Sequence, residues 1–228
     1  MKIPATSRRL VASAVLIGLA ILVMPFVLRA IGLGYSGLVS DVSWRTHLAS
    51  PQYPTVTFGI FAHMVFGGLI SVIAPLQLIP GYAQRAPRWH RITGYAVFGL
   101  AIGAGGGGLV YIVVRGTLGG PVMDLGFSIY GALLIVAAIQ TTRHARARRL
   151  DQHRDWALRL VVLALGSWIY RVHYGIWNLA TGGIGSNRTF TGPFDYVQDF
   201  GFYLPYLLVL EAWLWHRRQR VTVARLSG

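Results

Sequence analysis

The sequence predicts an all-α protein built as a polytopic bundle of transmembrane helices. Three observations support this fold class: 54% of the 228 residues are hydrophobic, 12% are charged, and the apolar residues gather in six long stretches. A hydrocarbon core about 30 Å thick needs roughly 20 apolar residues per helix, and a soluble domain could not cover its surface with so few charges. The expected spans lie near residues 10–31, 57–80, 92–114, 122–142, 156–180 and 199–216. Because little chain remains between them, residues 1–228 are expected to form a single transmembrane domain.

The expected spans differ in their connections and in their small residues. The apolar run that starts at Leu10 is longer than the hydrophobic region of a signal peptide, so it is expected to remain as an uncleaved first span. Residues 32–56 form the longest connection, and their Gly and Pro residues predict irregular structure. In the third span, Gly103 and Gly107 remove side chains from one helix face, which favours close helix packing; the alternative is that the bare face admits a flat cofactor. The second to fifth spans are expected to form the main bundle.

Positive charge is distributed unequally between the two sides of the predicted bundle. The formal net charge is +14, and the basic residues crowd alternate connections, as they do in the cytoplasmic loops of membrane proteins. Both termini are therefore predicted to be cytoplasmic, the basic face is expected to attract anionic lipid, and nucleic-acid binding is not expected. The cytoplasmic group comprises Lys2, Arg8, Arg9, Arg85, Arg88, Arg91, Arg143, Arg146, Arg148, Arg149, Arg154, Arg217, Arg218, Arg220 and Arg225; the opposite group comprises Arg45, Arg115 and Arg188.

The chain contains no cysteine. This absence excludes disulfides, thiolate metal sites, covalent attachment of c-type haem and thiol catalysis. Hydrolase, kinase, nucleotide-binding and metalloprotease motifs are also missing from the sequence. The sequence therefore assigns no enzymatic reaction.

Four histidines are candidate cofactor ligands. Counting about 1.5 Å per residue along each helix, His63 and His173 share a depth in the outer half of the membrane, whereas His90 and His153 share the cytoplasmic interface. Neutral imidazole is the usual axial ligand of b-type haem, so these residues are predicted to bind haem b or a metal ion. His63 is the deepest and the best single candidate, because ionisable groups inside a bilayer are costly. The alternative is that His90, His153 and His173 are ordinary interface residues.

Two arginines are expected inside the fifth span. Glu211 lies at a depth similar to that of Arg159, so an ion pair between them is predicted. Arg171 has Asp199 and Asp124 as the acids within its reach. The structural interpretation is that these pairs hold three spans together. The functional alternative is a site for an anion, a quinone or a haem propionate, or a proton path.

The order of these residues resembles the DUF2306 family of bacterial membrane proteins. The resemblance covers roughly residues 57 to 215 and implies the same helical membrane fold in a multi-pass protein of the bacterial inner membrane. His173 is not part of the family pattern, and the function of the family is unassigned. The matching residues are His63 followed by Gly67-Gly68, then His90-Arg91-Ile92-Thr93-Gly94-Tyr95, then His153-Arg154-Asp155-Trp156, and then Arg159 and Arg171.

Three hypotheses for the function remain open at this stage. The leading one is a redox-type membrane protein that binds haem b or a metal through its intramembrane histidines and exchanges electrons with quinone. The second is a transporter or channel, although the sequence lacks the inverted repeats typical of that class. The third is a non-catalytic membrane subunit or assembly factor that packs against a membrane-protein partner or a second copy of the chain.

Overall fold

The computed structural model describes residues 5–42 and 46–226, and within these ranges the chain forms helices joined by loops, with no strand. The predicted all-α fold is therefore confirmed. Lys2 and Arg45, which contributed to the predicted charge distribution, lie outside the described residues. The helices are α1 (Ala5–Val39), α2 (Pro54–Leu76), α3 (Tyr82–Arg85), α4 (Pro87–Arg115), α5 (Gly120–Arg146), α6 (Leu150–Thr181), α7 (Pro193–Gly201) and α8 (Leu204–Leu226).

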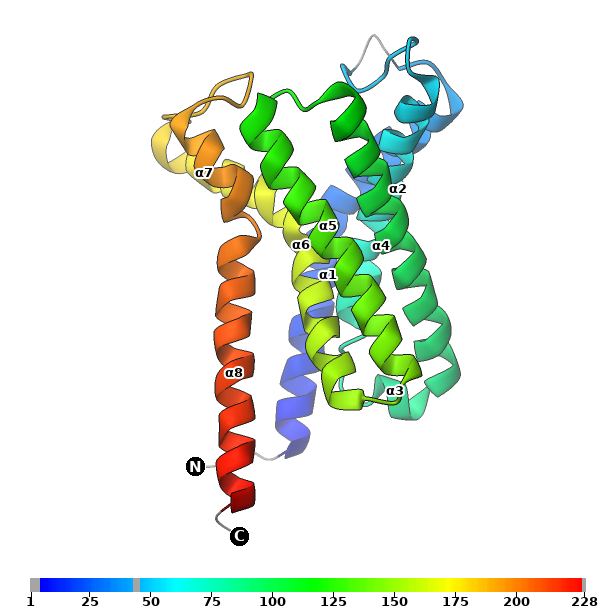
Figure 1. Ribbon diagram of the computed structural model, residues 1–228, viewed down its shortest axis with the longest axis vertical. Coiled ribbons are helices and arrows are strands. Elements are labelled where there is room, and N and C mark those ends of the chain that lie inside the picture. The colour runs from blue at the N-terminus through cyan, green and yellow to red at the C-terminus, as the bar shows by residue number, and fades with distance from the viewer. Residues whose placement is uncertain (1–4, 43–45, 227–228) are drawn as a thin grey trace.

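Four of these helices form a bundle. Helix α2 packs on α4, α4 on α5, α5 on α6, and α6 again on α2, so α4 and α6 stand at diagonal corners (Figure 1). Helix α1 packs on the outer face of α2, while α8 contacts α6 and α7. The bundle therefore has an interior lined by α2, α4, α5 and α6, and both cavities described below lie in it.

Small residues let the bundle helices approach closely. Ala101 and Ala138 are completely buried, and a Cβ atom added to Gly107 would lie 2.6 Å from the carbonyl oxygen of Gly59. Helix association inside a bilayer relies on such close packing, because lipid tails are as apolar as the helix surfaces. The glycine stripe of α4 thus packs against α2, whereas a side chain at Gly99 would meet open space.

Within the described residues, four helices are long and apolar enough to cross a membrane: α1, from Arg9 onwards, and α2, α4 and α5. This supports a multi-pass membrane protein. Helices α6 and α8 also occupy expected spans, but they carry more charge.

The prediction of one continuous last span near 199–216 is corrected by the structure. Asp199 belongs to the short helix α7, the chain turns at Phe202 and Tyr203, and α8 begins at Leu204.

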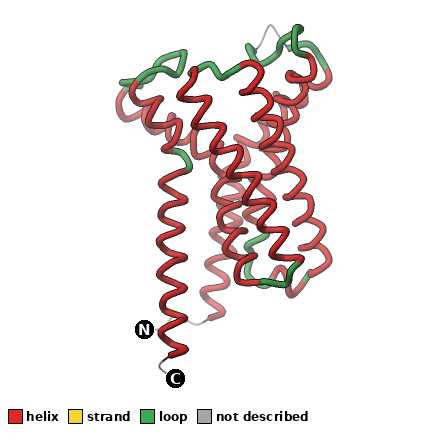
Figure 2. Tube along the Cα trace, viewed as in Figure 1, coloured by secondary structure: helices red, strands yellow, loops and turns green. Residues whose placement is uncertain are grey.

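The connections gather at the two ends of the bundle (Figure 2). The start of α1 and the end of α8 lie on the same side as α3 and the α5–α6 turn (Figure 1), and we call this side the inner end. The other side, the outer end, carries residues 40–42 and 46–53, the loops at 116–119 and 182–192, and α7. The crowded arginine groups of the sequence therefore meet at the inner end.

Candidate functional site

A cavity of about 710 Å³, the inner cavity, lies at the inner end of the bundle. His90 on α4 and His153 on α6 both line it. Since α4 and α6 are diagonal helices, the two imidazoles reach the cavity from opposite corners. The structure thus brings together two of the histidines that the sequence selected. Polar and basic lining residues accompany them: Arg9, Gln77, Arg85, Thr141 and Arg154.

The hydrogen bonding of the two inner histidines differs. The Nδ1 atom of His153 lies 2.9 Å from the carbonyl oxygen of Thr141. A carbonyl only accepts, so Nδ1 carries the proton and Nε2 of the neutral ring keeps its lone pair. The ring of His90 packs edge-on against Tyr82, and its Nδ1 atom is buried without a hydrogen-bond partner among the described residues. An orphaned buried nitrogen is typical of a group whose partner is a bound ligand or water.

A second cavity, the outer cavity, has a volume of about 290 Å³ and extends from the outer loops into the bundle. His63 and Arg171 line it. The Nδ1 atom of His63 lies 2.5 Å from the carbonyl oxygen of Ala104 and therefore donates to it. Gly108 leaves room for this ring, since a Cβ atom there would lie 3.0 Å from Nδ1. His63 is thus held in one orientation at a distance from the inner pair.

Arg171 does not form the expected ion pair with Asp199 or Asp124, and among the described residues no carboxylate lies within ion-pair distance of it. Its Nη1 atom donates to the carbonyl oxygen of Ser167 at 2.7 Å, and the guanidinium lies 4.9 Å from the centre of the Phe26 ring. Asp124 instead accepts a hydrogen bond from the Thr117 amide at 2.6 Å in the α4–α5 connection. Matching depth along two helices did not ensure that the side chains face one another.

His173 lies outside both cavities. Its Nδ1 atom is within hydrogen-bond distance of the Gln198 amide, and its Nε2 atom lies 2.7 Å from the Tyr206 hydroxyl. Both ring nitrogens are therefore engaged, and the residue links α6 to α7 and α8. The expected depth match with His63 does not bring the two rings to one site.

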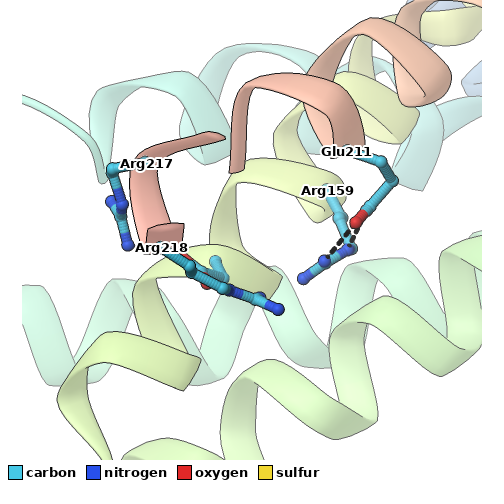
Figure 3. A network of polar contacts seen from close by, with 5 residues as sticks. Arg159, Glu211, Arg217 and Arg218 are labelled. Carbon is cyan, nitrogen blue, oxygen red and sulfur yellow. Dashed lines mark hydrogen bonds and ion pairs between the residues drawn. The ribbon is translucent and has the colours of Figure 1, made fainter. Parts of the chain in front are cut away.

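Helix α8 is joined to α6 by ion pairs (Figure 3). Nε and Nη2 of Arg159 donate to the two carboxylate oxygens of Glu211 at 2.5 and 2.7 Å. Asp155, which is 3% exposed, accepts hydrogen bonds from Arg217 and Arg218, each at 2.7 Å. The sequence predicted the first pair but not the second, because Arg217 and Arg218 were assigned only to the basic cytoplasmic group.

Two buried carboxyl groups on α7 have opposite surroundings. Burial acts to raise the pKa of Asp195, but hydrogen bonds from Ser186, Tyr174, Gly192 and Asn187 together outweigh it and lower the pKa. Asp199 is completely buried and neither oxygen has a hydrogen-bond partner among the described residues. Burial, aided by the charge of Asp195, raises the pKa of Asp199 to about 7. Asp199 is thus a proton-binding group rather than a partner for Arg171.

The substitution Asp199→Asn is expected to remove a pH dependence of stability. In the unfolded chain the carboxyl group loses its proton above its ordinary pKa of about 4, whereas in the folded protein it holds the proton until about pH 7. The unfolded state therefore binds fewer protons in this window, and the stability of the wild type falls as pH rises. At pH 8 the variant should be the more stable of the two, by about 4 kcal/mol at most. Thermal unfolding in detergent between pH 4 and 8 measures this, and parallel melting temperatures for the two proteins across that range would contradict it.

The described residues contain no metal site that is made of protein side chains alone. No group of three or more His, Cys, Asp or Glu side chains is arranged there to hold a metal ion.

The fold and its cavities define a class: a multi-pass α-helical membrane protein with histidines facing the interior of a four-helix bundle. The model of the DUF2306 family, described as predicted membrane protein, matches residues 60–191. The chain belongs to this family, and the resemblance seen in the sequence is confirmed. The matched segment contains His63, His90, His153, Arg159 and Arg171. No curated protein and no solved structure matches the chain.

Proposed function

We propose that the protein is a redox-type membrane protein that binds haem b in the inner cavity, with His90 and His153 as the axial ligands. The observation that carries the proposal is that these two histidines, from diagonal helices of the bundle, line one cavity. Its volume of about 710 Å³ lies within the roughly 300–1,000 Å³ typical of ligand and cofactor pockets. Bundle cores are common places for such sites, because side chains of facing helices project into them.

The surroundings of the two histidines support axial ligation. A histidine ligand usually donates its other ring proton to a backbone carbonyl, a carboxylate or water, which fixes the tautomer and the orientation of the ring. His153 makes such a bond to the Thr141 carbonyl. The Nδ1 atom of His90 has no protein partner among the described residues, so this ring is held by packing against Tyr82. We therefore expect His153 to be the more rigid ligand of the two.

The basic lining of the inner cavity supports an anionic cofactor. Arg9, Arg85 and Arg154 line the cavity, and arginine binds carboxylates through paired N–H donors. These residues would hold the haem propionates at the inner end, where charge is least costly. The apolar side chains of Val97, Phe98 and others would exclude water from the ring faces. When bound, the haem supplies one-electron transfer.

A pyridine haemochrome assay on the purified protein tests the proposal. Expression should be in cells supplied with a haem precursor, and the expected result is about one haem b per chain. A colourless protein from such cells would overturn the proposal and favour the transporter or the non-catalytic subunit instead.

We further propose that α6 and α8 complete a six-span protein of the bacterial inner membrane with both termini in the cytoplasm. Helix α6 has 32 residues, which corresponds to about 48 Å and exceeds the hydrocarbon thickness of about 30 Å. The crowded arginines of the inner end support its cytoplasmic placement, and they would also attract anionic lipid.

Cysteine labelling is expected to report opposite sides for the two ends of the bundle. The native chain contains no cysteine, so single-cysteine variants need no background mutations. In spheroplasts, whose inner membrane is still sealed, a membrane-impermeant maleimide should label Arg188→Cys at the outer end. It should label Gln84→Cys in α3 only after permeabilisation. Labelling of both variants before permeabilisation would refute this topology.

A further inference from the structure

The outer cavity plays no part in the proposed haem site, yet its walls are those of a ligand pocket. Its volume of about 290 Å³ is close to the lower end of the range for small-molecule sites. Apolar side chains make up most of the wall. Two ionisable side chains, His63 and Arg171, also line the cavity, and such groups are costly inside a membrane. The principal apolar residues are Ile60, Met64, Leu109, Phe127 and Leu134.

We propose that the outer cavity binds the ring of a membrane hydroquinone, with His63 and Arg171 as its two polar contacts. This inference goes beyond the proposed haem site and does not rest on it, because ligand binding can be measured with or without haem. The hydrogen bonds that His63 and Arg171 already make determine which ligand groups each of them can still bind.

His63 presents an acceptor to the ligand. Its Nδ1 proton is already donated to the Ala104 carbonyl, so Nε2 of the neutral ring offers a lone pair. Its position is fixed by close packing, since a side chain at Gly108 would collide with the ring. A ligand hydroxyl can donate to this nitrogen, whereas a carboxylate would place negative charge against a lone pair.

Arg171 presents donors to the ligand. A guanidinium has five N–H donors, and in Arg171 one nitrogen, Nη1, donates to Ser167. Because no carboxylate among the described residues neutralises it, Arg171 can donate to a ligand oxygen and favour partial negative charge there.

The two groups together define a ligand with one hydroxyl and one further oxygen on a flat apolar body. A hydroquinone donates one hydroxyl to Nε2 of His63 and accepts from Arg171 at its other oxygen, while the ring fills the apolar space. Phe127 and Tyr130, which also line the cavity, offer aromatic faces for the ring. Membrane hydroquinones dissolve in the bilayer and so reach a site at membrane depth.

Equilibrium binding of short-chain ubiquinol and of menadiol, both kept reduced under anaerobic conditions and followed by tryptophan fluorescence of the purified full chain in nanodiscs, tests this inference. The expected result is saturable binding at one site per chain, weakened about tenfold or more by Arg171→Gln and by His63→Phe, which keeps a flat ring but removes the acceptor. Arg143→Gln, which removes an exposed arginine at the inner end of α5 that does not line the outer cavity, is the matched control and should bind like the wild type.

A photoreactive azidohydroquinone on the unmodified protein gives an answer that does not depend on variant folding. Covalent label on the α4, α5 or α6 peptides that line the outer cavity would support the inference. Absence of saturable binding, equal affinity in the wild type and Arg171→Gln, or label confined to peptides outside the cavity would overturn it. Competition by palmitate at lower concentration than hydroquinone would also overturn it, since the site would then select a carboxylate.

Discussion

Replacing Asp195 with alanine is expected to destabilise the outer end of the protein by about 3 kcal/mol or more. The carboxylate is completely buried and accepts hydrogen bonds from Ser186 and Tyr174, each at 2.7 Å, and from the amides of Gly192 and Asn187 at 2.9 and 3.2 Å. Hydrogen bonds to a charged group contribute about 1.5–3 kcal/mol each, and removing the acceptor leaves buried donors unsatisfied. We expect a large fall in the melting temperature and faster proteolysis of the 182–192 loop.

Two variants separate this effect from a general effect of charge. Asp151→Ala removes an exposed acid from the start of α6 and should leave the melting temperature nearly unchanged. Asp199→Asn alters the other buried acid of α7 and should raise stability above pH 7. An Asp195→Ala protein that unfolds at the same temperature as Asp151→Ala would contradict the assigned role of Asp195.

Loss of either inner histidine is expected to abolish stable haem binding. His90→Ala and His153→Ala each remove one of the two proposed axial ligands, and the inner cavity offers no other described histidine to replace it. The haem content of the purified variants should fall to a small fraction of that of the wild type. Absorption at the Soret band per mole of protein measures the loss, with the melting temperature as a check on folding.

The histidines outside the inner cavity provide the comparison. His216→Ala changes an exposed residue of α8 and should keep the full haem content. His63→Phe should also keep it, because His63 lines the outer cavity. If His63→Phe lost its haem while His90→Ala retained it, the haem site would lie in the outer cavity, and the assignment of His90 and His153 as ligands would be refuted.

The sequence predicted the helical class because hydropathy and arginine placement are properties of whole segments. It also predicted that Arg159 and Glu211 lie at one depth, and the structure pairs them because α6 and α8 are neighbours. The same reasoning failed for Arg171. Depth follows from counting residues along a helix, whereas the direction of a side chain depends on packing around the helix axis, which a single sequence does not contain.

The break between α7 and α8 was not predictable from hydropathy. Phe202 and Tyr203 are buried aromatic residues that read as part of an apolar span, yet they form the turn between the two helices. The role of Asp195 was equally hidden, because three of its four donors, Ser186, Asn187 and Gly192, come from a loop. This loop folds back through Gly182, Gly183 and Gly185, all with positive φ. Such loops are set by local backbone geometry rather than by polarity.

Electron paramagnetic resonance of the oxidised, purified wild-type protein distinguishes a haem held by two histidines from one held by a single histidine, because the ligands set the spin state of the ferric iron. We expect a low-spin ferric signal in the wild type and its loss in both His90→Ala and His153→Ala. A high-spin signal in the wild type, or a haem-free protein from haem-supplied cells, would contradict the claim that His90 and His153 jointly hold a haem in the inner cavity.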